Sequence, residues 1–252
     1  MQGMIAEPDI KNRPECAVVV PVHNEAENVG PLIDEIIIAF NKRRYEIILV
    51  DDGSDDGTAE ILAKLTMQHK SLEVITHDHV KGQSTAIVSG IKAANAAIII
   101  TMDGDGQNDP ADAPKLLERF LDLGGGDRIM MVGHRINRRD TWLKRSASKV
   151  ANIVRSSLLK DATPDTGCGL KVFSQRAFIE MPAFDHMHRF LPALMIRAGG
   201  KVLSVPVNHR SRIHGVSKYG LWNRLLVGIT DLLGVMWLIR RKTNAEPKKV
   251  GD

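Results

Sequence analysis

The chain has 252 residues, 25% of them charged and 43% hydrophobic, so it is long enough for one well-buried α/β domain and is not disordered outside its ends. Its two cysteines, Cys16 and Cys168, form no spaced disulfide framework, and Met1 to Glu15 hold no apolar segment typical of a secretory signal. These features predict a cytoplasmic protein with reduced thiols.

The net charge of +4 hides an asymmetry between two halves of the chain. Met1 to Asp127 carry 11 Lys/Arg against 22 Asp/Glu, a balance of −11, while the remainder carries 23 against 8, a balance of +15. An acidic half suits a divalent cation, and a basic half suits phosphates or an anionic membrane surface. Two solvated surfaces that simply differ in charge are the alternative.

Short apolar runs alternate with helical patterns in the first half. The predicted strands are Ala17 to Val22, Glu46 to Val50, Leu72 to Thr76, Ala97 to Met102 and Ile129 to Gly133. The predicted helices are Val29 to Phe40, Thr58 to His69, Ser84 to Ala96 and Ala113 to Leu123. This order predicts an α/β fold with a Rossmann-like, mostly parallel sheet and helices on both faces. Ligands bind such sheets beyond the carboxyl ends of the strands.

The second half is less regular. Its predicted elements are a basic helix from Trp142 to Lys160, a strand from Gly167 to Phe173, a helix from His188 to Ala198 and a strand from Val202 to His209. Leu221 to Ile239 then form an apolar stretch of 19 residues, close to the length that spans a bilayer.

The polar residues of this last stretch gather on one side of a helix and its apolar residues on the other. The first set is Asn223, Arg224, Thr230 and Asp231, and the second is Trp222, Leu225, Ile229, Leu232, Leu233 and Met236. The pattern favours an amphipathic helix on a membrane surface over a membrane span, with the basic Arg240, Arg241 and Lys242 after it. A terminal helix packed on the core is the alternative.

Acidic side chains follow the first two predicted strands. The turn after the first carries Glu25 and Glu27 where a dinucleotide-binding turn has glycines, and two carboxylates there disfavour an NAD pyrophosphate. After the second strand, Asp51 and Asp52 point to opposite sides, so one of them is expected to reach a ligand.

The segment after the fourth predicted strand is the most informative. In an extended turn, Asp103 and Asp105 project to the same side, where hard oxygen ligands can hold Mg²⁺ or Mn²⁺ and leave positions open for phosphate oxygens. Gln107 continues the alternation as a candidate third ligand. An acidic turn that only opens the next helix, with Asp109 and Pro110, is the alternative.

Six segments cover nearly the whole chain apart from its tails. In order they are VVVPVHNEAENV, ILVDDGSDDGT, KGQSTAIVSGI, TMDGDGQNDP, DTGCGLKVF and RIHGVSKYG. Together they resemble the family 2 glycosyltransferases of GT-A fold, and within them the dolichol-phosphate mannosyltransferase-like enzymes. Two positions depart from the family's usual pattern, which often has Tyr in place of His23 and Phe-Arg in place of Leu170-Lys171.

The resemblance implies a nucleoside-diphosphate sugar donor and a bound metal. It implies Asp103, Asp105 and Gln107 around the cation. The residues that it implies around the nucleotide sugar are Pro21, His23, Glu25, Asp52 and Gly82, together with Asp103. Whether the base is uracil or guanine stays open.

The basic half predicts an anionic acceptor. A phosphate monoester needs no general base because it is already charged, but it needs cations beside it. The sequence offers Arg135, Arg138, Arg139, Lys144, Arg145, Lys149, Arg210, Arg212 and Lys218. The resemblance implies Arg135, Arg145 and Arg212 as phosphate clamps, with Ser148 and Lys218 also at the acceptor phosphate.

These observations predict an inverting, metal-dependent glycosyltransferase that uses a GDP- or UDP-linked sugar and a polyprenyl phosphate of dolichyl or undecaprenyl type. We expect it at the inner face of the cell membrane, peripherally associated, with no nucleic-acid partner. One alternative is a hydroxyl acceptor on a cell-surface glycan, for which Asp185 or His188 lies where a base would be held, although packing or capping is the simpler role for each. The other is a non-catalytic module that binds anionic membranes.

The expected organisation has four parts. They are a tail at 1–14, a catalytic domain at 15–219 divided into a nucleotide and metal half (15–127) and an acceptor half (128–219), a membrane-surface helix at 220–242 and a tail at 243–252.

Overall fold

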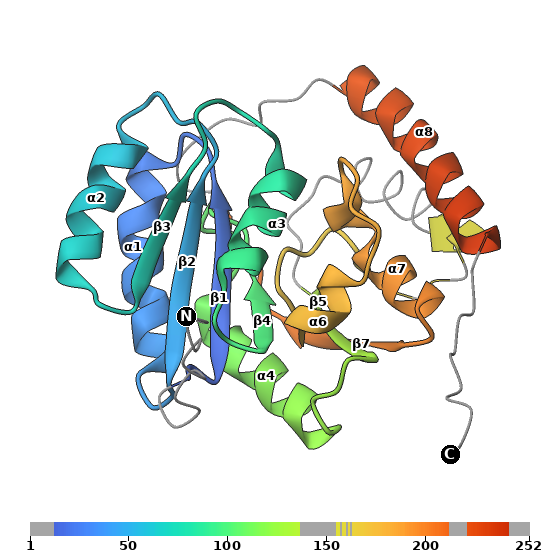
Figure 1. Ribbon diagram of the computed structural model, residues 1–252, viewed down its shortest axis with the longest axis horizontal. Helices are drawn as coiled ribbons and strands as arrows, with labels where there is room; N and C mark the ends of the chain where they lie inside the picture. Colours follow the sequence, from blue (N-terminus) through green and yellow to red (C-terminus); the bar gives the residue numbers. More distant parts are fainter. Residues whose placement is uncertain are drawn as a thin grey trace, which may run out of the picture.

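The computed structural model describes residues 13–136, 155–156, 158–159, 161, 163–211 and 221–241, the last range with side chains from 228 onward. The strands are β1 (Cys16–Val22), β2 (Tyr45–Asp51), β3 (Leu72–Thr76), β4 (Ile98–Thr101), β5 (Ile129–Arg135), β6 (Lys171–Ser174) and β7 (Lys201–Val207). In the described part of the chain they form one sheet of seven strands in the order β3-β2-β1-β4-β6-β5-β7 (Figure 1).

Helices cover both faces of this sheet. They are α1 (Ala26–Phe40), α2 (Thr58–Gln68), α3 (Gln83–Ala93), η1 (Pro110–Asp112), α4 (Ala113–Asp122), α6 (Gln175–Ile179), η2 (Met187–Arg189), α7 (Leu191–Arg197) and α8 (Leu221–Arg240). Strand β1 divides the core, because Val18 and Val20 pack with α1, α2 and α4 while Ala17 and Val19 pack with α3, α6, α7 and α8. The sheet is therefore buried on both sides, as its continuous apolar runs predict.

The predicted mostly parallel α/β sheet is confirmed. Strands β1 to β4 run parallel, with β1 paired to β2 and β4 and β2 paired to β3. The register of Val22 opposite Asp51 places the carboxyl ends of β1 and β2 at the same edge. Strand β6 runs antiparallel between β4 and β5, so the acceptor half of the chain continues the same sheet.

Three elements differ from the prediction. Strand β6 begins at Lys171, four residues after the predicted Gly167, because residues 166–167 form a turn. The helix predicted from His188 to Ala198 is divided into η2 and α7, since Phe190 leaves the helical region and Pro192 opens a new first turn, where its missing N–H costs nothing. The short helix α6 was not predicted. Most of the basic helix predicted at Trp142 to Lys160 lies outside the described residues.

Helix α8 packs on the core along one side, the alternative that the sequence left open. Val235 is fully buried, Leu232 and Met236 pack on the same cluster, and Arg197 Nε donates to the carbonyl oxygen of Leu238 at 2.9 Å. Asp231, expected on the polar side, faces the protein, with its carboxylate 3.1 Å from His186 Nδ1. In the part of the chain that the structure describes, no helix is long and apolar enough to cross a membrane.

Candidate active site

The acidic residues that follow β2 and β4 meet at the first residues of α3. The Gly82 N–H donates to Asp52 Oδ2 at 2.8 Å, and the next residue, Gln83, donates from Nε2 to Asp103 Oδ1 at 2.9 Å. Both carboxylates therefore lie at the carboxyl edge of the parallel strands, where this class of sheet binds ligands. The body of the sheet does not separate them.

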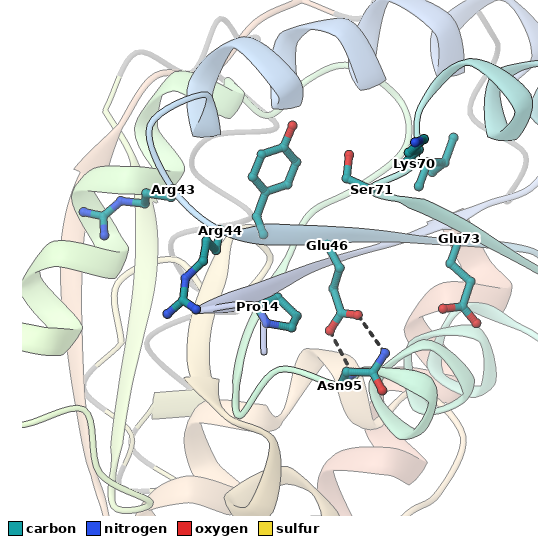
Figure 2. A pocket seen from close by; sticks show the side chains of 10 residues that line it. Pro14, Arg43, Arg44, Glu46, Lys70, Ser71, Glu73 and Asn95 are labelled. Carbon is teal, nitrogen blue, oxygen red and sulfur yellow. Dashed lines mark hydrogen bonds between the residues drawn. The ribbon is translucent and has the colours of Figure 1, made fainter. Parts of the chain in front are cut away.

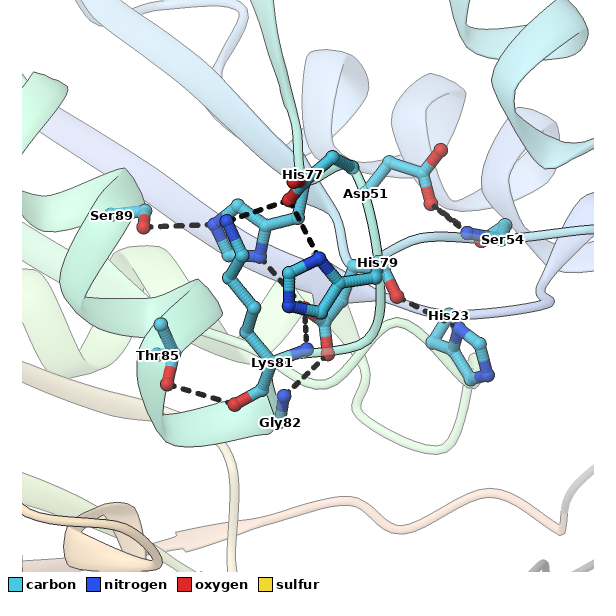
Figure 3. Close-up of polar contacts among 11 residues, drawn as sticks. His23, Asp51, Ser54, His77, His79, Lys81, Gly82, Thr85 and Ser89 are labelled. Carbon is cyan, nitrogen blue, oxygen red and sulfur yellow. Dashed lines mark hydrogen bonds and ion pairs between the residues drawn. The ribbon is translucent and has the colours of Figure 1, made fainter.

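Asp52 organises the loop that leads into α3, and Figure 3 shows its partners His77, Lys81 and Gly82. Its Oδ1 accepts hydrogen bonds from His77 Nδ1 at 2.7 Å and from the Lys81 N–H at 2.8 Å. Burial alone would raise the pKa of Asp52, but these bonds and the one from Gly82 lower it below its ordinary value. Asp52 is thus a stable anion, while its neighbour Asp51 accepts from the Ser54 N–H at 3.1 Å and only fixes its own turn.

The turn after β1 is tied to the loop after β2. His23 Nδ1 lies 3.0 Å from the carbonyl oxygen of Asp52, and the Glu25 N–H donates to Thr58 Oγ1 at 3.0 Å. The Glu25 carboxylate accepts from Asn28 Nδ2 at 2.6 Å. The structure therefore brings His23 beside Asp52 and Glu25 beside Thr58, and Pro21 lies in β1 just before them.

Asp103 is held in place from three directions. Its N–H donates to Asn108 Oδ1 at 3.0 Å, Gln83 reaches its carboxylate, and the backbone of Gly169 lies directly against it. A Cβ on Gly169 would stand 2.3 Å from Asp103 Oδ2, so any other residue there would displace the carboxylate. Gly169 is itself anchored to β4, since its carbonyl oxygen accepts from Thr101 Oγ1 at 2.7 Å.

The carboxylates of Asp103 and Asp105 lie close enough to repel each other. Burial and the charge of Asp105 raise the pKa of Asp103, and the positive charges of Lys171 and Arg135 oppose that rise without cancelling it. No three His, Cys, Asp or Glu side chains among the described residues gather around one point. The two carboxylates are hard oxygen ligands whose negative charges the protein does not fully compensate. They are therefore suited to bind a divalent cation whose other ligands come from a substrate or from water.

Gln107 contacts protein on the other side of this turn. Its side-chain Nε2 lies 3.5 Å from the backbone carbonyl oxygen of Arg210, and its backbone carbonyl oxygen accepts from the Arg210 N–H at 3.0 Å. The Arg210 guanidinium is engaged by Glu35 at 2.5 Å and Asp109 at 2.8 Å. The segment after β7 is therefore fixed against the acidic turn, and metal binding by Gln107 stays a prediction.

Arg135, at the end of β5, is held by a buried carboxylate. Asp165 accepts from its Nε at 2.6 Å and from its Nη2 at 2.7 Å in a bidentate pair. Burial would lower the pKa of Arg135, but Asp165 raises it above its ordinary value, so the guanidinium stays charged. The structure thus makes Arg135 a fixed cation. The other expected acceptor residues, Arg145, Ser148, Arg212 and Lys218, lie outside the described residues.

The model of glycosyl transferase family 2 matches residues 17–181 of the chain. The chain belongs to this family. It is 36% identical over 234 residues to the dodecaprenyl-phosphate galacturonate synthase of Rhizobium johnstonii, which covers 90% of this chain and 68% of that protein. It is 33% identical to the undecaprenyl-phosphate 4-deoxy-4-formamido-L-arabinose transferase of Edwardsiella ictaluri, covering 84% of this chain and 65% of that protein. The chain thus spans about two thirds of the length of these relatives.

Solved glycosyltransferase structures share the fold. Mannosyl-3-phosphoglycerate synthase from Rubrobacter xylanophilus superimposes with a TM-score of 0.66 at 17% identity, over 94% of this chain and 79% of that one. The mannosyltransferase PcManGT from Pyrobaculum calidifontis, in complex with GDP-Man and Mn²⁺, gives a TM-score of 0.61 at 18% identity, over 93% and 66%. The expected GT-A fold is confirmed.

This glycosyltransferase also has a buried lysine whose part in the site was not predicted from the sequence. Lys171, in β6, is 4% exposed and donates from Nζ to the carbonyl oxygen of Cys168. Burial lowers its pKa, although the charges of Asp103 and Asp165 favour the protonated form. The sequence signal for this residue was that Leu170-Lys171 departs from the pattern usual in the family. In the structure Lys171 lies close enough to Asp103 to lower the pKa of that carboxyl.

A shallow pocket at the opposite end of the sheet is a separate feature (Figure 2). It has a volume of about 560 Å³ and lies where β2 and β3 begin, lined by residues that include Arg44, Lys70 and Glu73. Glu46, also in its wall, accepts from the Asn95 N–H at 2.8 Å. Because this end carries the amino ends of the parallel strands, the pocket is remote from the acidic residues of the candidate active site.

Proposed function

We propose that this glycosyltransferase transfers a sugar from a nucleoside diphosphate to the phosphate of a polyprenyl lipid. The observation that carries the proposal is the Asp103 and Asp105 pair at the carboxyl edge of the sheet, joined through Gln83 and Gly82 to Asp52. The names of both relatives, a dodecaprenyl-phosphate synthase and an undecaprenyl-phosphate transferase, support the lipid phosphate as acceptor.

Asp103 and Asp105 would hold Mg²⁺ or Mn²⁺, with Gln107 as a further ligand. The cation, when bound, would neutralise the charge that develops on the nucleoside diphosphate as it leaves. The chain contributes the placement of the carboxylates, because Asn108 and the Gly169 backbone fix Asp103 before any ligand arrives. The Mn²⁺ in the PcManGT complex supports a divalent ion in this fold.

The nucleotide would lie across the ends of β1 and β2. Pro21, His23 and Glu25 line the turn after β1, and Asp52 and Gly82 line the facing loop. Three donors already occupy the Asp52 carboxylate, so its part is to hold this loop in place beside the nucleotide.

The acceptor phosphate would be gathered by fixed cations. Arg135 supplies one in the described part of the site, and Arg145, Arg212 and Lys218, with Ser148 as a donor, complete the proposed clamp. A lipid phosphate oxygen attacks the anomeric carbon on the face opposite the diphosphate, so the configuration inverts. No side chain has to remove a proton, because the nucleophile is already anionic.

The exposed side of α8 would lie on the anionic inner surface of the cell membrane. Ile229, Leu233 and Trp237 are 50%, 60% and 60% exposed, and their spacing of four residues places them in one stripe along the helix. Arg240 and Arg241 are exposed at its end, where anionic head groups would meet them. Binding by this surface would bring the acceptor half of the sheet near its lipid.

A panel of nucleotide sugars tests the proposal. The purified chain is incubated with Mn²⁺, decaprenyl phosphate and, in turn, UDP-galacturonic acid, UDP-glucose and GDP-mannose, and the lipid is analysed by mass spectrometry. We expect a sugar-phosphate-lipid product with at least one donor, and none when decaprenol replaces the phosphate. Transfer to decaprenol or to a glycan hydroxyl, but not to the phosphate, would favour the hydroxyl acceptor and refute this proposal.

A further inference from the structure

His188, in η2, borders the donor side of the candidate active site. Its Nδ1 lies 2.8 Å from Ser84 Oγ, and Ser84 directly follows Gln83, whose amide holds Asp103. The loop before η2 reaches the same place, since Asp185 Oδ1 lies 3.7 Å from where a Cβ on Gly82 would stand. The imidazole is therefore fixed relative to the residues proposed to hold the donor.

The contacts of Ser84 determine which ring nitrogen of His188 carries the hydrogen. Ser84 is 3% exposed, and its Oγ accepts from the His188 backbone N–H at 3.3 Å. A buried hydroxyl hydrogen needs an acceptor, and Nδ1 of His188 is the one that the described contacts offer. Nδ1 therefore accepts from the hydroxyl, and the ring hydrogen lies on Nε2.

This tautomer excludes His188 as a general base. Burial and the nearby charges of Lys171, Arg189 and His186 lower the pKa of His188 to about 3, so the ring is neutral at neutral pH. Its lone pair points at Ser84, while the other nitrogen already carries a hydrogen. Among the residues that the structure describes, Nε2 has no hydrogen-bond partner, so an N–H donor is left for a ligand.

We propose that His188 donates a hydrogen bond from Nε2–H to an oxygen of the sugar being transferred. The inference rests on the proposed function and adds a contact that recognises the sugar itself. A neutral donor suits a sugar hydroxyl or carboxyl oxygen, whereas the acceptor phosphate has Arg135 as a charged partner. Its attachment to Ser84, beside Gly82 and Gln83, places it against the donor.

Two variants separate the hydrogen bond from the packing role of the ring. In His188→Asn the amide oxygen takes the position of Nδ1 and still accepts from Ser84, but the Nε2–H is lost. In His188→Gln the amide N–H takes the position of Nε2. Calorimetry in Mn²⁺ compares the binding of UDP and GDP with that of UDP-galacturonic acid, UDP-glucose and GDP-mannose.

We expect His188→Asn to bind the preferred nucleotide sugar about five- to tenfold more weakly while its affinity for the sugar-free diphosphate is unchanged, and His188→Gln to stay within about twofold of wild type. Equal losses for diphosphate and nucleotide sugar, or no loss in His188→Asn, would overturn the inference. A wild-type chain that binds the diphosphates but none of the sugars also overturns it. A wild-type chain that binds no nucleotide at all refutes the proposed function itself.

The tautomer has its own spectroscopic test. In ¹⁵N spectra of the histidine rings, assigned with His188→Gln, we expect His188 to show an unprotonated Nδ1 and a protonated Nε2 without change between about pH 5 and pH 8. A ring that titrates near its ordinary pKa of 6.5, or that carries its hydrogen on Nδ1, contradicts the assignment.

Discussion

Replacing Gly169 with alanine tests how strictly the backbone positions Asp103. The new Cβ would stand 2.3 Å from Asp103 Oδ2, whereas ordinary contacts begin at 3.4 Å, so the two groups must separate by about 1.1 Å. The two backbones are both held, because Thr101 Oγ1 donates to the Gly169 carbonyl oxygen and the Asp103 N–H donates to Asn108 Oδ1, so the Asp103 side chain is the part left to shift. The carboxylate is therefore expected to move.

A shift of about 1 Å in a group that positions a reacting ligand costs on the order of 100-fold in rate. We expect Gly169→Ala to lower kcat by that order and to lower stability by roughly 1–3 kcal/mol, as overpacking does. The matched control is Gly126→Ala, because a Cβ there meets nothing within 4 Å and the residue lies in the turn before β5, away from the acidic edge. Steady-state transfer and chemical denaturation of both variants give the comparison, and a Gly169→Ala enzyme with normal kcat would refute the reasoning.

Three further outcomes follow from the site and from α8. Asp105→Ala removes half of the carboxylate pair, so transfer should fall by on the order of 100-fold or more; near-normal transfer by this variant in EDTA contradicts the metal role. Asp52→Asn loses an anion whose folded-state pKa is lowered, so in urea titrations it should be about 1–3 kcal/mol less stable at neutral pH. The stabilisation from ionised Asp52 is present above its unfolded-state pKa, near 4, and is lost as pH falls through its lower folded-state pKa. The difference in unfolding free energy between wild type and Asp52→Asn should therefore shrink in acid, and a difference that stays constant with pH would contradict this. Leu233→Gln with Trp237→Gln should weaken sedimentation with anionic vesicles by about tenfold without lowering Tm, since both side chains are exposed; unchanged sedimentation argues against the membrane face.

The nucleotide half of the fold was predictable because its signals are local. Strands β1, β2 and β4 are largely apolar runs followed by acidic turns, and the predicted strand at Leu72 to Thr76 coincides with β3. The acidic strand ends then had to meet, because parallel strands place their carboxyl ends at one edge. Asp52 and Asp103 accordingly contact adjacent residues, Gly82 and Gln83.

The acceptor half depends on contacts that no short window of sequence contains. The strand predicted from Gly167 begins only at Lys171, and the Gly169 backbone before it packs on Asp103, 66 positions earlier in the chain. The bidentate pair of Arg135 with Asp165 and the hydrogen bond of His188 with Ser84 likewise join distant segments. Periodicity gives the faces of a helix, but only the folded chain shows which face meets the core.

In the proposed function, a divalent cation held at the end of β4 joins the protein to a diphosphate. The most direct test of this is the affinity of Mn²⁺ in the presence and absence of UDP or GDP, measured by electron paramagnetic resonance for the wild type and for Asp103→Asn. We expect the diphosphate to tighten Mn²⁺ binding at least tenfold in the wild type and to have no such effect in the variant. Mn²⁺ binding that ignores the diphosphate, or that survives unchanged in Asp103→Asn, would contradict the account.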